Sequence, residues 1–226
     1  MNLLAIETST ELCSVALLKG GQLFMEEVVA ENRHSDLLAP MIRKVLERSH
    51  LAAIRMDAFG FGQGPGSFTG IRIACGIVQG MAFAAQRPVV PIPSLLALAD
   101  QSNEGRVIAA LDARMGEAYL AAYARNGEDW DEVIAPRLVT AASLPPLPGR
   151  RWAATGSGFD NHAWLRDAYR DSIEMRIEGD LPRARSVARL AMRRFAQGAG
   201  IAPALAAPLY LRDKVALTTE ERRSTR

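Results

Sequence analysis

The chain is organised around Gly60-Phe61-Gly62-Gln63-Gly64-Pro65-Gly66-Ser67-Phe68-Thr69-Gly70-Ile71-Arg72 and the long apolar segment that follows it up to Gln86. Residues 56–61 alternate apolar side chains as a strand does, and the glycines at 62, 64 and 66 then allow a sharp turn. Ser67 is a suitable N-cap. These features predict a strand, a glycine turn and a helix. The turn could cradle an anion at the helix N-terminus or only connect two elements, and the glycines leave both interpretations open.

The segment from Ser67 to Gln86 has a single charged residue, Arg72, and small or apolar residues around its whole circumference. A one-sided surface helix would carry a polar stripe. We therefore expect one side to pack on a sheet, and the opposite side to be covered by another part of the chain or by another protein. Gly76 and Gly80 would let a second helix approach closely. Burial of the whole helix inside its own domain is an equally good interpretation.

Length and composition predict an ordinary globular chain. With 226 residues, 49% of them hydrophobic, it can form one large domain or two small ones. We expect no membrane span, because Arg72 and several glycines interrupt the longest apolar run, and we expect a cytoplasmic location. Cys13 and Cys75 lack metal-ligand spacing and are expected to be buried, reduced thiols.

The net charge of +2 is unevenly distributed. Residues 150–226 hold 15 Lys and Arg against 9 Asp and Glu, or +6, whereas residues 1–149 hold 12 against 16, or −4. The arginines of the basic half are spread out without interleaved aromatic residues. This pattern favours a solvated helix face over a dedicated nucleic-acid site, and leaves an auxiliary contact to RNA open.

Hydrophobic periodicity predicts two similar α/β lobes, residues 1–100 and 101–214, with the second less complete. The predicted strands of the first lobe are 3–6, 13–18, 23–29, 56–61 and 88–92, the first three forming an antiparallel meander, and its helices are 35–50 and 67–86. The predicted strands of the second lobe are 106–112, 117–124, 130–134 and 152–155, and its helices are 159–169 and 185–197. The polar tail, residues 215–226, is expected to be disordered.

A search for catalytic chemistry finds little. The glycine turn lacks the lysine of a Walker P-loop, and it fits neither the dinucleotide G-x-G-x-x-G nor the hydrolase G-x-S-x-G pattern. The three histidines are isolated, so no metalloenzyme site can be assembled. One polar cluster, Glu7-Thr8-Ser9-Thr10-Glu11, ends a strand and could face a phosphate with Gly64, Gly66 and Ser67 opposite. A hairpin turn that binds nothing is an equally good alternative. For Asp112 and Glu117 too, the sequence does not decide between a binding role and a structural one.

Four motifs occur in order along the chain: Ile6-Glu7-Thr8-Ser9-Thr10, Gly64-Pro65-Gly66-Ser67-Phe68-Thr69-Gly70-Ile71-Arg72-Ile73, Pro93-Ser94-Leu95 and Asp112-Ala113-Arg114-Met115-Gly116-Glu117. Together they resemble the TsaB family, also called YeaZ. The resemblance runs from residue 1 to about 120 and continues weakly to Pro208-Leu209-Tyr210-Leu211-Arg212. The string Gly-Pro-Gly-Ser-Phe-Thr-Gly-x-Arg is highly specific.

The resemblance implies an α/β chain with the actin-like ATPase (ASKHA) fold of two ribonuclease-H-like lobes. It implies a non-catalytic scaffold that works with TsaD and TsaE in placing threonylcarbamoyl on a tRNA adenosine, so that tRNA is met indirectly. Glu7, Thr8, Ser9, Thr10, Gly64, Gly66 and Ser67 would then be a vestigial phosphate loop. No cofactor would be required, and ADP or ATP would bind weakly at the complex interface.

Family resemblance also implies a partner surface. The first two helices are expected to form a helical bundle with TsaD, or with a second copy when the chain is alone. The expected contact residues are Leu38, Met41, Ile42, Val45, Ile73, Ile77 and Met81.

Two alternatives come from other classes of protein. A stand-alone nucleotide hydrolase or sugar kinase of the actin-like superfamily would carry an aspartate in its first phosphate loop and a glycine-rich second loop, but Glu7 and Arg114-Met115-Gly116 stand there. A peptidase, as in the old family label, would need a metal or a nucleophile, which a zinc assay would test.

Overall fold

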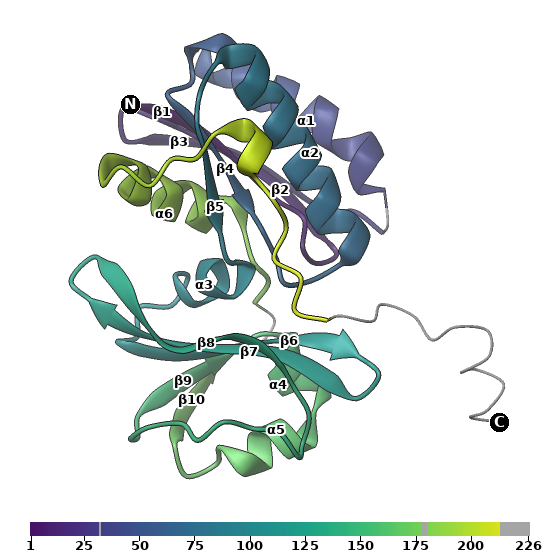
Figure 1. Ribbon diagram of the computed structural model, residues 1–226, viewed down its shortest axis with the longest axis vertical. Coiled ribbons are helices and arrows are strands. Elements are labelled where there is room, and N and C mark those ends of the chain that lie inside the picture. Colours follow the sequence, from purple (N-terminus) through teal and green to yellow (C-terminus); the bar gives the residue numbers. More distant parts are fainter. Residues whose placement is uncertain (32, 178–179, 213–226) are drawn as a thin grey trace, which may run out of the picture.

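The computed structural model describes residues 1–31, 33–177 and 180–212, and it has two lobes, each built on a five-stranded sheet (Figure 1). The predicted disordered tail, residues 215–226, lies outside the described residues.

The first lobe has the strand order β3-β2-β1-β4-β5. β1 (Asn2–Glu7), β2 (Leu12–Lys19) and β3 (Gln22–Val29) form the predicted antiparallel meander. β4 (Ala58–Gly62) and β5 (Val89–Ile92) extend the sheet in parallel with β1. The carboxyl ends of β1 and β4 therefore lie at the same edge of the sheet, which brings Glu7 beside the glycine turn.

Helices cover both faces of this sheet (Figure 1). α1 (His34–Ser49) and α2 (Phe68–Ala85) pack on one face, where Leu38 and Val78 are fully buried. α6 (Ala184–Ala196) packs on the other face, against β1, β2 and β4. Two short 3-10 turns, η1 (Ala53–Arg55) and η2 (Pro203–Leu205), contact α2.

The second lobe repeats the pairing of the first, with the order β10-β9-β6-β7-β8. Its strands are β6 (Arg106–Arg114), β7 (Glu117–Asn126), β8 (Asp129–Val139), β9 (Trp152–Thr155) and β10 (Ile173–Ile177). Residues 140–151, which join β8 to β9, are all described and contain no helix, whereas the first lobe has α1 at this point. The second lobe is therefore less complete, as predicted.

Three elements differ from the sequence-based prediction. The helix predicted over 159–169 is two short helices, α4 (Ser157–Asn161) and α5 (Ala163–Ala168), because the backbone at His162 is extended. α3 (Ser94–Ala99) and β10 were not predicted. All six residues of α3 are buried, so it lacks the polar side that produces a helical periodicity.

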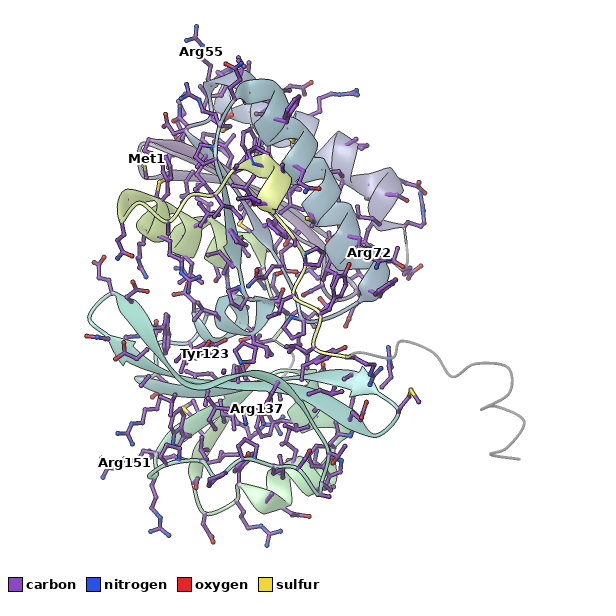
Figure 2. The ribbon with its side chains drawn as sticks, in the orientation of Figure 1. Met1, Arg55, Arg72, Tyr123, Arg137 and Arg151 are labelled. Atoms are coloured by element: carbon purple, nitrogen blue, oxygen red, sulfur yellow. The ribbon has the colours of Figure 1, made fainter. Side chains whose placement is uncertain are left out.

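α6 comes from the second half of the sequence but completes the first lobe. It contributes Val187, Leu190 and Ala191 to a hydrophobic cluster that also contains Leu3 of β1 and Tyr123 of β7. Tyr123 lies at the junction of the lobes (Figure 2). The division of the chain into lobes at residue 100 stays a prediction. The shared cluster means that the two lobes bury apolar surface against each other.

α2 does not fit our expectation that no segment is long and apolar enough for a membrane span. Its 18 residues meet that requirement by length and composition, with a mean hydropathy of 1.4. The core helix of a sheet protein passes the same test, and 39% of these residues are buried in the structure. The prediction treated Arg72 and the glycines as interruptions, whereas Ile71, Ile73, Ile77 and Val78 keep the mean hydropathy of the helix high despite them.

Candidate functional site

The glycine turn packs directly against the β1–β2 turn. Ser67 N–H donates to the carbonyl oxygen of Ser9 at 2.7 Å, and Thr8 Oγ1 donates to the carbonyl oxygen of Gly70 at 2.8 Å. A Cβ atom added at Gly66 would lie 2.2 Å from the Ser9 carbonyl oxygen, and one added at Gly70 would lie 2.0 Å from that of Thr8. The two predicted loops are therefore in contact rather than opposite each other across a ligand.

The start of α2 already uses several of its free N–H groups. Ser67 is the predicted N-cap, and its Oγ accepts from Gly70 N–H at 3.3 Å. The Ser67 N–H is bonded to the Ser9 carbonyl oxygen, and the Ile71 N–H makes the first ordinary bond of the helix, to the Ser67 carbonyl oxygen at 3.0 Å. Gly64 has a φ of +96°, which explains the glycine, and its N–H donates to Ser94 Oγ at 3.2 Å. This end of the helix offers an anion fewer donors than an open phosphate loop.

Glu7 points into the protein. Its carboxylate accepts from Ser9 N–H at 2.6 Å and from Ser94 Oγ at 2.8 Å, and its side chain is fully buried. Burial raises the pKa of the Glu7 carboxyl, and the hydrogen bonds from Ser9 and Ser94 offset only part of that rise. Glu7 therefore joins β1 to α3 and does not face a ligand.

A cleft of about 520 Å³ lies between the lobes. Of the predicted phosphate-loop residues, Ser9, Thr10, Gly66 and Ser67 line it, whereas Glu7, Thr8 and Gly64 do not. Three carboxylates also line it, those of Glu11, Glu31 and Asp112, together with the guanidinium groups of Arg114 and Arg212. The cleft is thus the place where the two lobes present polar groups to one another, and its walls carry charges of both signs.

Asp112 occupies the position in the second lobe that Glu7 occupies in the first. Its carboxylate accepts from Arg114 N–H at 2.8 Å and from Asn161 Nδ2 at 3.1 Å, and His162 Nε2 lies 3.2 Å away. Partial burial alone would raise the pKa of this carboxyl, but these hydrogen bonds outweigh it, so that the pKa lies below its ordinary value. Asp112 remains an anion held within its own lobe.

The C-terminal strap, residues 201–212, runs beside α2 and reaches the second lobe. Gln79 Nε2 donates to the carbonyl oxygen of Ala206 at 2.9 Å. Arg72, at the end of α2 nearest the second lobe (Figure 2), donates through Nε to Tyr210 Oη at 2.6 Å. Arg212 donates to the carbonyl oxygen of Ala113 at 2.9 Å and is paired with Glu117. The family resemblance at residues 208–212 thus falls on a segment that bridges the lobes. Glu117, which the sequence left open, forms an ion pair with Arg212 of this segment.

The seven predicted partner residues divide into two sets. Leu38 and Val45 are fully buried beneath α1 and Met41 and Ile42 are each 8% exposed, so of these four predicted contact residues only Ile42 reaches an open surface, the groove described below. They face the sheet because they carry the apolar side of an amphipathic helix. The α2 residues Ile73, Ile77 and Met81 are only partly buried, which leaves part of each side chain available for a partner.

An open groove of about 550 Å³ lies between α1 and α2. It is lined by Ala39, Ile42, Arg43, Leu46, Glu47, His50, Leu51, Ile77 and Met81. On the outer side of α2, a Cβ atom added at Gly76 or Gly80 would meet no atom of the described chain within 4 Å. Phe83, in the same helix, is 77% exposed. The structure thus leaves an uncovered face on α1 and α2 with room for another helix.

The arginines of α6 form a face that is only partly solvated: the side chains of Arg189 and Arg193 are 48% and 31% exposed, and both also bind groups at the junction of the lobes. Arg189 is paired with Asp100 at 2.9 Å, and Arg185 Nη2 donates to Gln101 Oε1 at 3.3 Å. Arg193 donates to the carbonyl oxygen of Glu128. The periodicity of α6 placed these residues on one side of the helix, but that side meets the second lobe.

Within residues 1–31, 33–177 and 180–212, no three side chains of His, Cys, Asp or Glu lie close enough to hold a metal ion. Cys13 and Cys75 are free and buried, as predicted.

Comparison with known proteins identifies the family. The family model described as TsaD, tRNA N6-adenosine threonylcarbamoyltransferase, matches residues 27–219. The curated tRNA threonylcarbamoyladenosine biosynthesis protein TsaB of Escherichia coli is 36% identical over 96% of both chains. The protein of the same name from Haemophilus influenzae is 36% identical over 95% of both. The chain belongs to the TsaB family.

Solved structures of TsaB-family proteins agree with this assignment. YeaZ from Pseudomonas aeruginosa is 35% identical, with a TM-score of 0.83 over 93% of this chain and 99% of its own. A second structure, of a protein with similarity to peptidase YEAZ from the same organism, gives a TM-score of 0.84 with the same coverage. The predicted family and the predicted α/β fold of two repeated lobes are confirmed.

Proposed function

We propose that this chain acts in tRNA threonylcarbamoyladenosine biosynthesis as a non-catalytic subunit that binds TsaD through the uncovered face of α1 and α2. The pathway is supported by the names of the curated relatives. The wider complex would include TsaE, and tRNA would be met through the complex. A second copy of the chain would occupy the same face when TsaD is missing, and the complex would work in the cytoplasm.

The observation that carries this proposal is the open face of α2. Ile73, Ile77 and Met81 form a partly buried apolar ridge, and Gly76 and Gly80 lie beside it with open space above them. Small residues at this spacing let two helix backbones approach closely, and the apolar ridge supplies the surface that such a contact buries. The buried α1 residues anchor this helix to the sheet and so fix the position of one wall of the groove.

A tightly held nucleotide does not fit the inter-lobe cleft. The N–H groups of Ser67 and Gly70 are already bonded within the chain, and Glu7 is turned into the core. Glu11, Glu31 and Asp112 line the walls, and the two arginines that also line them, Arg114 and Arg212, are each paired with a carboxylate of the chain, which disfavours a triphosphate. We therefore propose that no cofactor is required, and that ADP or ATP binds only weakly, at the interface with TsaD.

The partner surface can be tested by substituting an exposed glycine. Gly80→Arg adds a long charged side chain where a Cβ meets no atom of the described chain within 4 Å, so the fold should be retained. Gly80→Ala is the matched control, because it adds only a methyl group at the same position. We expect Gly80→Arg to weaken binding to TsaD on the order of 100-fold, as expected when a charge is buried at a contact, and Gly80→Ala to bind within a few-fold of wild type.

Binding is measured by calorimetry or by size-exclusion chromatography with TsaD, with circular dichroism as the folding control. Ile77→Asp provides a second variant on the neighbouring ridge. Folded Gly80→Arg and Ile77→Asp chains that both bind TsaD like wild type would refute the α1–α2 face, and attention would move to the second lobe.

A further inference from the structure

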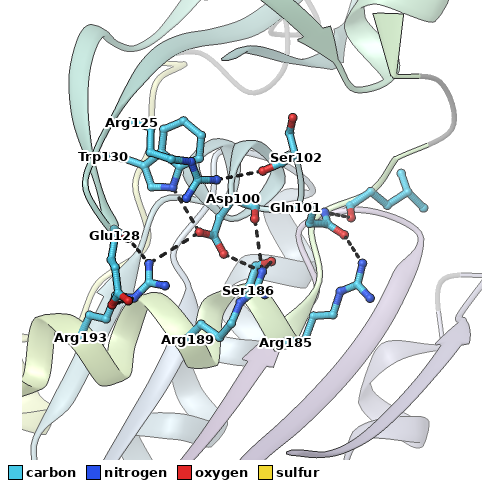
Figure 3. Close-up of polar contacts among 11 residues, drawn as sticks. Asp100, Gln101, Ser102, Arg125, Glu128, Trp130, Arg185, Ser186, Arg189 and Arg193 are labelled. Carbon is cyan, nitrogen blue, oxygen red and sulfur yellow. Dashed lines mark hydrogen bonds and ion pairs between the residues drawn. The ribbon is translucent and has the colours of Figure 1, made fainter. Parts of the chain in front are cut away.

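We propose that Asp100 holds the two lobes together as one rigid body. This residue follows α3, and its carboxylate lies where α6 of the first lobe meets β8 of the second (Figure 3). The inter-lobe lock is defined here as Asp100, Trp130, Arg189 and Arg193. The inference goes beyond the proposed function, because it concerns the relative motion of the lobes and does not depend on any partner.

Asp100 receives donors from both sides of the junction. Arg189 of α6 donates to Oδ2 at 2.9 Å and to the Asp100 carbonyl oxygen at 3.2 Å. Trp130 of β8 donates through its indole Nε1 to Oδ1 at 3.1 Å. Arg193 Nη1 lies 4.0 Å from the same oxygen. One carboxylate therefore joins an element of each lobe.

The carboxylate is almost completely removed from water, since only 3% of the Asp100 side chain is exposed. A buried charge is costly unless it keeps its partners, and the low local dielectric strengthens the interactions that it makes. Moving the second lobe away from α6 would separate Asp100 from Trp130 or from Arg189. Any such movement would therefore leave a buried carboxylate only partly satisfied.

Further contacts near Asp100 connect the two lobes at the same junction. The Arg125 guanidinium lies 4.2 Å from the centre of the Trp130 ring, and its Nη2 donates to the carbonyl oxygen of Ser102 at 2.9 Å. Arg193 also reaches the β7–β8 turn through the carbonyl oxygen of Glu128. The hydrogen bonds to Ser102 and Glu128 cross between the α3–α6 layer and the second sheet, whereas the Arg125–Trp130 contact lies within that sheet and holds the Trp130 ring in place (Figure 3).

The apolar cluster beneath the lock supports the same inference. Leu95 and Leu98 of α3, Val107 of β6, Tyr123 of β7 and Leu190 of α6 pack in one buried cluster. Domains joined by small polar interfaces usually move relative to one another, whereas a large hydrophobic interface suppresses that motion. The cluster supplies the attraction, and Asp100 selects one geometry among those that would bury the same apolar surface.

Hydrogen exchange followed by mass spectrometry tests the proposal on the full chain. Asp100→Asn removes the charge and keeps the size, and Arg189→Gln removes the donor from α6. Asp167→Asn is the matched control, because Asp167 forms an exposed pair with Arg170. We expect both lock variants to exchange amides of α3 and β8 on the order of 10-fold faster than wild type, while amides of β1 and α1 keep their wild-type rates. The control should match wild type throughout.

Two outcomes would overturn the inference. The first is unchanged exchange in α3 and β8 of both lock variants, which would show that Asp100 does not hold the junction. The second is an equal acceleration in β1 and α1, which would show that Asp100 supports the whole fold rather than the contact between lobes. If Asp100→Asn fails to fold, Arg189→Gln decides between these outcomes and the expected one.

Discussion

Gly66 and Gly70 show why the glycine string is so specific. A Cβ atom at either position would lie within 2.2 Å of a carbonyl oxygen of the β1–β2 turn. We predict that Gly66→Ala and Gly70→Ala each lose about 1–3 kcal/mol of unfolding free energy, because a methyl group forces the two loops apart. Urea unfolding measures the change. Gly80→Ala is the control, and it should gain about 0.5–1 kcal/mol, since alanine favours a helix and the site is open.

Glu7 should make stability depend on pH. Its pKa in the folded chain lies above that in the unfolded chain, so the folded state keeps its proton longer as the pH rises. The stability that Glu7 contributes is therefore fully present below the unfolded pKa, near 4.5, and is lost as the pH rises through the folded pKa. Glu7→Gln, which cannot ionise, should lose less unfolding free energy than wild type over this window.

Unfolding of the two chains by urea at several pH values measures this difference. A constant difference between wild type and Glu7→Gln from pH 4 upward would show that Glu7 does not titrate abnormally.

Interactions between residues close in sequence were predictable, and those between residues far apart in sequence were not. Ser67 caps α2 within four residues of its partner Gly70, and both the cap and the turn were predicted from the sequence. Glu7 was placed in a phosphate loop, whereas its carboxylate binds Ser94, 87 positions away. Only the pairing of β1 with β4, and of β4 with β5, brings these two residues together.

Among the elements, α1 demonstrates how a predicted partner face can be a core face. We predict that Leu38→Ala loses about 2–5 kcal/mol, because the side chain is fully buried against the sheet. Arg43→Ala, on the exposed side of the same helix, should change stability by less than about 0.5 kcal/mol. Thermal or urea unfolding distinguishes the two. Equal stabilities would mean that α1 does not pack as the structure describes.

The apolar pattern of α1 and α2 predicted both helices but could not say which side each presents to a partner. In α1 the apolar side packs against the sheet, as is usual for an amphipathic helix. In α2 small residues surround the helix, so orientation depends on the position of η2 and the C-terminal strap, which contact it from distant sequence. α3 was missed altogether, because a helix buried on every side has no period.

For the whole molecule, we predict no peptidase activity and little ATP hydrolysis by the purified chain. The described residues present no metal cluster, and Glu7 and Asp112 are both held by hydrogen bonds within their own lobes. A coupled ATPase assay and a peptide-cleavage assay measure these activities with and without zinc. Metal-independent ATP turnover near 1 s⁻¹, at the low end of the ordinary enzyme range, would contradict the prediction.

The two-lobed architecture followed from the repeated order of strands, but the contact between the lobes did not. The basic character of α6 suggested a solvated surface, because charge in a sequence carries no information about which carboxylate lies opposite. Asp100 and Arg189 are 89 positions apart, and the helix that carries the arginine returns to the first sheet only after the second lobe is built.

The return of α6 has a consequence for synthesis on the ribosome. When residues 1–100 have emerged, one face of their sheet is covered by α1 and α2, but the face that α6 covers still exposes Leu3 and Ala5. That face stays open until residue 196 has been translated, so the first lobe cannot finish folding before the second has been made. A nascent chain halted between these points would expose an apolar sheet to solvent, where chaperones bind, and a gene cut at residue 100 should yield an aggregating product.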